Sequence, residues 1–229
     1  IAKRAAEKTL QRLGAKRLTT QRCPVIFHAP VACSLLGNFT NAIAGVTLYR
    51  GISFLVDHLE KAIFPESITI QQHPHAMGAI GSAPFDDDGV KTHKINYVQD
   101  GVLVNYCLGT YSGRKLGMKS TGNAGGVHNV VMNHADKSLS DLFKEMGTGL
   151  FVTELIGQGV NIVTGSYSRG AFGFWVENGE IQYPVHEITI ASNLKDMFKG
   201  FVRVANDVDH RRNIKTGSIL IDQMMVAGE

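Results

Sequence analysis

Apolar residues follow a helical period in the first 65 positions of the chain and a two-residue period over much of the remainder. Residues 2–13 collect alanine and leucine on one helical face, which predicts a first helix. Residues 30–43 begin at a proline and repeat an apolar side chain every fourth position, which predicts a second helix. A third short helix is predicted for residues 54–63, with Ser53 as its N-terminal cap. The stretch CPVIFHAP at residues 23–30 predicts a strand between the first two helices.

The rest of the chain is dominated by predicted strands joined by short turns. Hairpins are predicted around Asp100-Gly101, Gly157-Gln158-Gly159 and Asn178-Gly179, further strands at 186–191 and 217–227, and short helices at 138–146 and 193–199. Short connections imply antiparallel pairing, because parallel strands need a long crossover. The prediction is an α+β fold, predominantly antiparallel β-sheet, with a few helices concentrated in the first 65 residues. No linker divides it, so residues 1–229 are predicted to form a single domain.

The composition is that of an ordinary globular protein. Of 229 residues, 44% are hydrophobic and 19% charged, which argues against a disordered or membrane-embedded chain. The net charge is only +3 and no basic cluster is interleaved with aromatic residues, so nucleic-acid binding is not predicted. The three cysteines form no CxxC pair and no signal peptide is visible, which indicates a cytoplasmic protein. The chain starts at Ile1, inside a predicted helix, which suggests that it is part of a longer protein.

The nine histidines do not form the pattern of a zinc-peptidase helix. Two histidines one turn apart, with a glutamate after the first, would let both imidazoles reach one metal ion, and this pattern is absent from the sequence. His73 and His75, with an aspartate such as Asp86 from the run at 86–88, are an alternative metal set; surface histidines and an acidic turn are the competing interpretation. No serine nucleophile has an assignable histidine partner. The residues alone therefore predict no catalytic residue and no self-sufficient active site.

Two glycine-rich segments are the remaining candidates for a binding role. STGNAGG at 120–126 lacks the ending of a phosphate-binding loop, and GSYSRG at 165–170 lacks the spacing of a nucleophile elbow. Glu154 and Glu177 lie in apolar runs, where a buried carboxylate needs a partner, and Arg169 is the predicted salt-bridge partner of one of them.

The strand that contains the single tryptophan has large apolar side chains on both faces. Phe172 and Phe174 alternate with Trp175 along FGFWV. Something must cover Trp175, either a core within this chain, which is the simpler interpretation, or a partner subunit.

Six stretches of the sequence are long and distinctive. They are CPVIFHAPVACSLLGNF, YRGISFLVDHL, SAPFDDDGV, TGNAGGVHN, GLFVTELIGQGVNIVTGSYSRGAFGFWVENGEIQYPVHEITIASNLKDMF and GSILIDQMMVAGE. Together they closely resemble the C-terminal part of the TldD/PmbA family, and within it the PmbA branch, also called TldE. The resemblance runs nearly end to end. It implies that an N-terminal α/β domain of the family is absent from this chain.

The resemblance implies a cytoplasmic zinc metalloprotease that processes or degrades small or unfolded peptides as a heterodimer of TldD-type and TldE-type subunits. Modulator of DNA gyrase is an older name for the family. In the TldD branch, two histidines of a helical His-Glu-x-x-x-His and a cysteine near the C-terminus hold the metal. Here the corresponding helix has Ser34, Leu35, Asn38 and Phe39 but no histidine, and Thr216 stands in the region expected to supply the cysteine. The resemblance therefore implies no cofactor in this chain and zinc in a TldD-type partner.

The sequence thus predicts a subunit that shapes a peptide-binding chamber and is not catalytic on its own. The residues predicted to contact substrate or partner are Thr121, Gly122, Asn123, Tyr167, Ser168, Arg169 and Gly170. The alternatives are a self-sufficient metallopeptidase that uses His73 and His75, a gyrase-associated or nucleic-acid-binding module, and a homodimer formed without the TldD-type partner. No membrane association is predicted, since no apolar run approaches the roughly 20 residues that span a bilayer.

Overall fold

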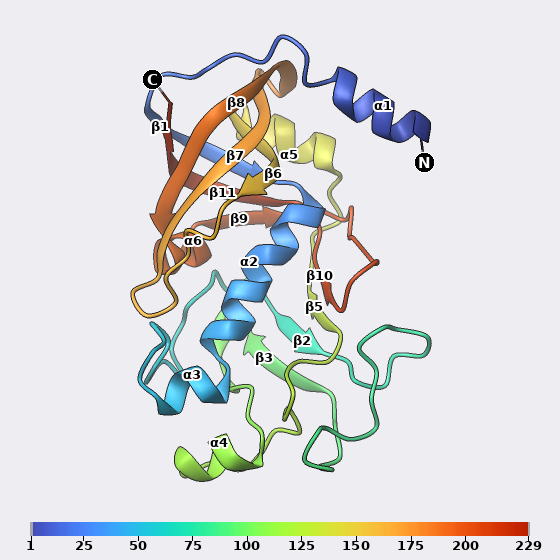
Figure 1. Cartoon of the computed structure of the whole chain (residues 1–229), viewed down its shortest axis with the longest axis vertical. Helices are drawn as coiled ribbons and strands as arrows, with labels where there is room; N and C mark the ends of the chain where they lie inside the picture. Colours follow the sequence, from blue (N-terminus) through green and yellow to red (C-terminus); the bar gives the residue numbers. More distant parts are fainter. Residues whose placement is uncertain (1, 229) are drawn as a thin grey trace.

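The computed structural model describes residues 2–228, which form six helices and eleven strands arranged in two sheets (Figure 1). The helices are α1 (Ala2–Leu10), α2 (Ala29–Ala42), α3 (Gly45–Tyr49), α4 (Thr110–Lys115), α5 (Leu139–Met146) and α6 (Leu194–Lys199). The strands are β1 (Gln21–Phe27), β2 (Ile70–Gln72), β3 (Ile95–Gln99), β4 (Val102–Leu103), β5 (Val130–Met132), β6 (Gly149–Ile156), β7 (Ser166–Glu177), β8 (Glu180–Asn193), β9 (Phe201–Val204), β10 (Ile214–Lys215) and β11 (Ile219–Ala227).

Five strands of the larger sheet close into a ring. The strand order is β1-β6-β7-β8-β11-β9, and β11 also pairs with β1, so that β1, β6, β7, β8 and β11 surround a common interior while β9 extends from β11. The inner face of the ring carries Phe27, Tyr167 and Trp175 into the main core. The smaller sheet has the order β10-β5-β2-β3-β4.

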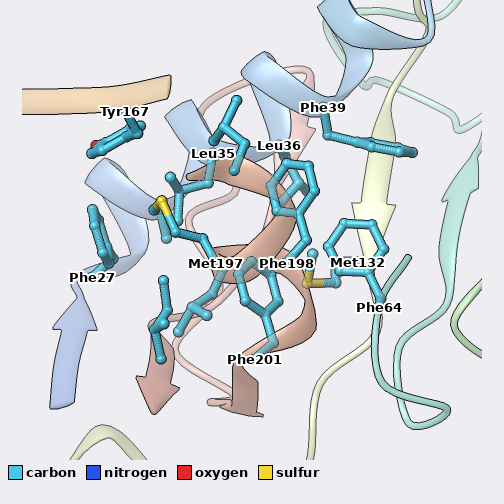
Figure 2. Packing of buried hydrophobic residues seen from close by; sticks show 14 of the residues in the cluster. Phe27, Leu35, Leu36, Phe39, Phe64, Met132, Tyr167, Met197, Phe198 and Phe201 are labelled. Carbon is cyan, nitrogen blue, oxygen red and sulfur yellow. The ribbon is translucent and has the colours of Figure 1, made fainter. Parts of the chain in front are cut away.

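Helix α2 lies between the two sheets and joins their cores (Figures 1 and 2). Its buried Leu35 and Phe39 belong to one apolar cluster that runs from the ring to the smaller sheet. Phe39 packs edge-on against Phe64 at 5.5 Å and against Phe198 of α6 at 6.1 Å between ring centroids. The proline near the start of α2, Pro30, has the fixed φ that suits a first helical turn.

Helix α5 covers part of the outer face of the ring. Leu142 and Met146 pack against Ile26, Val176 and other residues of a second, smaller core cluster. The helix begins at a capping box, in which Ser138 accepts a hydrogen bond from the amide of Asp141 while the Asp141 carboxylate accepts one from the amide of Ser138.

The predicted fold class is confirmed, and most local elements are found where the sequence predicts them. The hairpins at Asp100-Gly101 and Asn178-Gly179 form, with φ of 48° and 78° in the first and 54° and 76° in the second. Trp175 is covered within the chain, at 6% exposure, and its indole Nε1 donates to Glu177 Oε1 at 2.8 Å.

The predicted helix at 54–63 is wrong. Asp57 and Glu60 adopt φ of 56° and 62°, a left-handed backbone that a right-handed helix cannot include. The segment instead forms successive turns, and Ser53 stabilises the first of them by donating to Ala42 O and accepting from the Leu55 amide.

Two predictions about strand pairing also need correction. The run after Gly159 is not the second arm of a hairpin, because β7 begins only at Ser166 and Val160 makes a single bridge to Tyr167. The sheets are mainly antiparallel, but β1 pairs in parallel with β6, and β5 with β10. The long stretch of chain between β1 and β6 supplies the crossover that a parallel pair requires. The predicted strand at 186–191 is the second half of β8.

Candidate functional site

A cleft of about 530 Å³ opens on the outer face of the ring, between that face and the chain around α1. Its walls come from the end of α1, from His28 at the junction of β1 and α2, and from β6, β7 and β8. The volume is within the range of roughly 300–1,000 Å³ typical of ligand pockets.

Three phenylalanines form the apolar floor of the cleft. Phe151 and Phe174 stack at 6.4 Å between ring centroids, and Phe172 meets Phe174 edge-on at 5.8 Å. These side chains are adjacent because β6 and β7 are paired, with Phe151 opposite Phe174 and Glu154 opposite Phe172. The second apolar face that the sequence shows on β7 is therefore the floor of a cleft.

Cationic side chains form the rim of the cleft. The Arg12 guanidinium lies 4.5 Å from the ring centroid of Phe172 and donates to Glu154 Oε2 at 2.6 Å. Lys8 also lines the cleft, and Lys16, outside the lining, has its Nζ 4.4 Å from the ring centroid of the lining residue Tyr183. The cation–π contact with Phe172 leaves the Arg12 guanidinium at the edge of the cleft, where a ligand with acceptor groups could reach it.

The salt bridge predicted for Arg169 is wrong. Glu154 pairs with Arg12, and Glu177 accepts from Trp175 instead. Arg12 and Glu154 are 142 positions apart, so the sequence offers no local signal for their pairing.

His28 closes one end of the cleft, immediately before α2. Its ring lies edge-on to Phe151, 5.6 Å between ring centroids. Burial lowers the pKa of His28 below its ordinary value, and the nearby carboxylate of Asp207 offsets part of that effect. The same Asp207 accepts from the Ser218 hydroxyl at 2.7 Å, and Ser218 Oγ accepts from the Ala29 amide at 3.0 Å, which satisfies a free amide at the start of α2.

The region that the resemblance connects with metal binding is largely packed into the core, although Ser34 and Asn38 of α2 are partly exposed. Leu35 and Phe39 are fully buried in the core. Thr216 is also fully buried, and its hydroxyl donates to Gly217 O at 3.2 Å. The Cys33 thiol hydrogen-bonds to the backbone of Thr216, and burial raises its pKa, which opposes the thiolate form that zinc requires. These side chains do not fit a zinc ion.

The alternative metal set does not converge either. His73 Nε2 lies 3.3 Å from Gln71 Oε1, and His75 Nε2 lies 2.9 Å from Thr92 Oγ1. The Asp86 carboxylate accepts hydrogen bonds from the amides of Asp88, Val90 and Ala124, so it stabilises its own turn. Across residues 2–228, no three His, Cys, Asp or Glu side chains are grouped so that they could hold a metal ion.

The segment 120–126 lies beside the smaller sheet, and its polar groups point inward. Asn123 is 4% exposed; its Nδ2 donates to Gln72 Oε1 at 2.7 Å, and its Oδ1 accepts from the Thr121 hydroxyl at 2.9 Å. Gly122 has φ of 71°, and a Cβ there would lie 2.9 Å from Lys91 O. Thr121, Gly122 and Asn123 are thus part of the frame of the smaller sheet.

The segment 165–170 lies at the start of β7, at the end of the ring away from the hairpin turn. Ser168 is exposed, whereas Tyr167 is 1% exposed on the inner face. The Tyr167 hydroxyl and Arg169 Nε are both buried without a hydrogen-bond partner. Gly170 pairs with Ile156 of β6 and Thr189 of β8.

The structure does not bring the two predicted contact segments together. They belong to different sheets, and none of their seven predicted contact residues lines the cleft. Sequence reasoning missed Lys8, Arg12 and His28 as cleft residues. The only available signal was the position of His28 directly before a helix that begins with proline.

Comparisons with known proteins agree on one family. The family model described as the PmbA/TldA metallopeptidase C-terminal domain matches residues 20–228. A curated relative named Metalloprotease PmbA, from Escherichia coli O157:H7, is 53% identical over 224 residues, which cover 98% of this chain and 50% of the relative. A solved structure from Bacteroides thetaiotaomicron, described as a candidate modulator of DNA gyrase, superposes with a TM-score of 0.95 at 29% identity and covers 100% of this chain and 52% of that one.

A third similar protein is TldE from Thermococcus kodakarensis, with a TM-score of 0.84 at 25% identity over 100% of this chain and 55% of that one. The chain thus spans about half the length of the relatives it matches. In residues 2–228, no helix is both long enough and apolar enough to cross a membrane.

Proposed function

Because the chain belongs to the PmbA/TldD family of metallopeptidases, we propose that it is the PmbA/TldE-type subunit of a cytoplasmic TldD/TldE zinc protease. The protease would process or degrade small or unfolded peptides. This chain would supply part of the wall of the peptide-binding chamber, as one domain of the C-terminal type, and the TldD-type partner would supply the zinc ion.

The packing of α2 against Thr216 is the main support for placing the zinc ion in the partner subunit. Leu35, Phe39 and Thr216 are each fully buried, and the buried Cys33 thiol hydrogen-bonds to the backbone of Thr216. A catalytic zinc ion needs several deprotonated ligands and an open position for water. The described part of this chain provides neither at this junction, which supports a partner as the source of both.

The cleft supports a peptide-holding role. Its aromatic floor can contact apolar side chains without selecting one sequence, and the lining side chains of Lys8, Arg12 and Gln182 can bond to peptide carbonyls at its edge. A ligand held there would lie beside His28, which burial favours in its neutral form.

Mixing the full-length protein with a zinc-loaded TldD-type partner tests the proposal. We expect no peptide hydrolysis by the full-length protein alone, no stoichiometric zinc in it by elemental analysis, and hydrolysis of a small peptide once the partner is added. Substituting both His73→Ala and His75→Ala should leave the mixture fully active. Hydrolysis by the protein alone, with zinc that is lost in this double variant, would instead establish the self-sufficient metallopeptidase. A mixture that gains no activity would contradict the subunit role.

Matched variants test the role of the cleft within that mixture. Ile181 lines the cleft at 47% exposure, and Val46 lies outside its lining at 46% exposure. Both side chains are exposed, so Ile181→Glu and Val46→Glu should leave the fold intact. We expect Ile181→Glu to raise KM several-fold and Val46→Glu to change nothing. Equal KM values for the two variants would place the peptide elsewhere.

A further inference from the structure

Arg169 lies on the inner face of the ring, and its side chain is only partly exposed. Along the start of β7 the exposed residues are Ser166 and Ser168, and the residues of the alternate face, Tyr167 and Ala171, are buried. Arg169 shares that face and is paired in register with the fully buried Ile190 of β8. A cation in such a place is costly unless an acceptor compensates it.

No acceptor within residues 2–228 compensates it. Arg169 Nε is buried and has no hydrogen-bond partner, and the guanidinium makes no ion pair with any described carboxylate. The acidic residues of the neighbouring runs are already engaged, Glu154 by Arg12 and Glu177 by Trp175. Native proteins leave few buried polar groups unsatisfied, so each one requires an explanation.

Tyr167, on the same face of β7 as Arg169, has a second buried donor without an acceptor. Its ring packs edge-on against Phe27 at 6.4 Å and lies near α2 (Figure 2), but its hydroxyl is buried without a partner. Burial raises the pKa of this phenol, and the positive charge of Arg169 lowers it in part, which places the two groups within electrostatic reach of each other. The hydroxyl therefore stays protonated and remains a donor.

We propose that Arg169 and Tyr167 bind a carboxylate group. Two buried donors without acceptors, the Tyr167 hydroxyl and the Nε of a planar guanidinium, match a planar anion with two acceptor oxygens. If the proposed peptide-processing function holds, the carboxylate belongs to a peptide, either at its C-terminus or on an acidic side chain.

The loop between β6 and β7 provides the access route. It lies against the site, because Val160 bridges to Tyr167 and the Ser168 amide donates to Gly159 O at 2.7 Å. Most of its residues are exposed, and it begins and ends at glycines, Gly157 and Gly165, with left-handed φ of 81° and 79°. A peptide that lies along this loop can place a carboxylate beside the partly exposed Arg169 side chain.

Thermal unfolding and calorimetry of the full-length protein test the site with three variants. Arg169→Met removes the charge, Tyr167→Phe removes only the hydroxyl, and Ser168→Ala is the control on the exposed face. The probes are sodium acetate against sodium chloride at equal ionic strength, and N-acetyl-trialanine as the free acid against its C-terminal amide.

We expect acetate to raise the Tm of the wild-type protein and of Ser168→Ala, but not that of Arg169→Met. The free-acid peptide should bind roughly ten- to hundredfold more tightly than the amide, as one or two charge-assisted hydrogen bonds imply. Arg169→Met should abolish this difference and Tyr167→Phe should reduce it several-fold. Without ligand, both variants should unfold no earlier than the wild type, because each removes an unsatisfied donor.

The outcomes separate this site from the proposed function. Equal binding of acid and amide, or a response to acetate that survives Arg169→Met, overturns the carboxylate site and leaves the peptide-processing role standing. A response to acetate that depends on Arg169, without binding of either peptide, keeps the site and contradicts the peptide role. If an amidated peptide with an internal aspartate binds as well as the free acid, the carboxylate comes from a side chain; if it does not, it comes from the C-terminus.

Discussion

The segments 120–126 and 165–170 have similar compositions but different hydrogen bonding. Both combine glycine with small polar residues. Asn123 and Thr121 bond to each other and to the structure around them, whereas Arg169 Nε and the Tyr167 hydroxyl have no partner. A glycine-rich stretch therefore indicates a backbone that turns or that passes close to a neighbouring segment. The satisfaction of its polar groups is what separates the structural segment 120–126 from the segment 165–170, which is proposed to bind a carboxylate.

Two buried tyrosines show the same contrast. The Tyr97 hydroxyl donates to Gln72 Oε1 at 2.7 Å, an oxygen that also accepts from Asn123 and from the His128 amide. The Tyr167 hydroxyl has no acceptor. Both rings are fully buried, so burial alone does not show whether a tyrosine hydroxyl has a hydrogen-bond partner.

Removing the side chain of Asn123 should have the largest effect on stability. Asn123→Ala breaks the bonds to Gln72, to Gly126 O and to Thr121 in a buried site, and we expect a loss of about 2–3 kcal/mol in the free energy of unfolding, measured in urea. Asn206→Ala, at an exposed asparagine, should change it by less than about 0.5 kcal/mol. Equal losses in the two variants would remove the distinction between the segments.

Two glycine substitutions separate the cost of a left-handed backbone from the cost of a Cβ that meets neighbouring backbone. Gly122 and Gly117 have nearly the same φ, 71° and 68°, but only at Gly122 would a Cβ meet backbone, 2.9 Å from Lys91 O. Gly117→Ala should cost about 1 kcal/mol for left-handed φ alone, and Gly122→Ala about 2 kcal/mol because the contact adds to it. Equal unfolding midpoints for the two variants would show that the frame around Gly122 yields easily.

The sequence predicts the features of the fold that short segments determine. The hairpin at Asn178-Gly179 is predictable because its turn needs positive φ at two adjacent residues that tolerate it. The ring is not, because β1 pairs with β6 more than 120 positions away in a register that no local pattern encodes. At 54–63 a local pattern predicts a helix that does not form. Tertiary contacts override its periodicity and hold Asp57 and Glu60 at positive φ.

The sequence also predicts some features of the candidate site and not others. Phe172 and Phe174 are visible in the sequence as an apolar strand face, because a strand alternates its side chains. Their cationic rim is not, because Arg12 reaches Glu154 only after the ring has closed. The missing partner of Arg169 could not be predicted either, because an absent contact has no sequence pattern.

The two buried tyrosines provide a matched pair of substitutions. Tyr97→Phe removes a donor from Gln72 and should cost about 1–2 kcal/mol in the free energy of unfolding. Tyr167→Phe removes an unsatisfied hydroxyl and should leave that energy within about 0.5 kcal/mol of the wild type, or raise it. Urea unfolding at pH 7 measures both. A Tyr167→Phe variant as unstable as Tyr97→Phe would mean that the Tyr167 hydroxyl has an acceptor in solution.

The smallest expected effect on stability comes from His28, a partly exposed side chain, and it takes the form of a dependence on pH. Burial is the largest influence on its pKa, which is lowered; Lys8 and Arg211 add to the effect, and Asp207 and Asp209 oppose it. Since the folded state binds its proton more weakly, the free energy of unfolding should be constant above about pH 6.5, the ordinary value for histidine. It should then fall slightly as the pH decreases toward the folded pKa, because the unfolded state takes up the proton first.

Urea unfolding from pH 7.5 to 5 measures this slope, and His28→Gln should flatten it. Burial also lowers the pKa of His73, so a smaller slope of the same sign should remain in the variant. A stability that increased on acidification would require a raised pKa for His28, with Asp207 and Asp209 outweighing its burial. The cleft would then present a cation beside Phe151, which would favour acidic peptides over neutral ones.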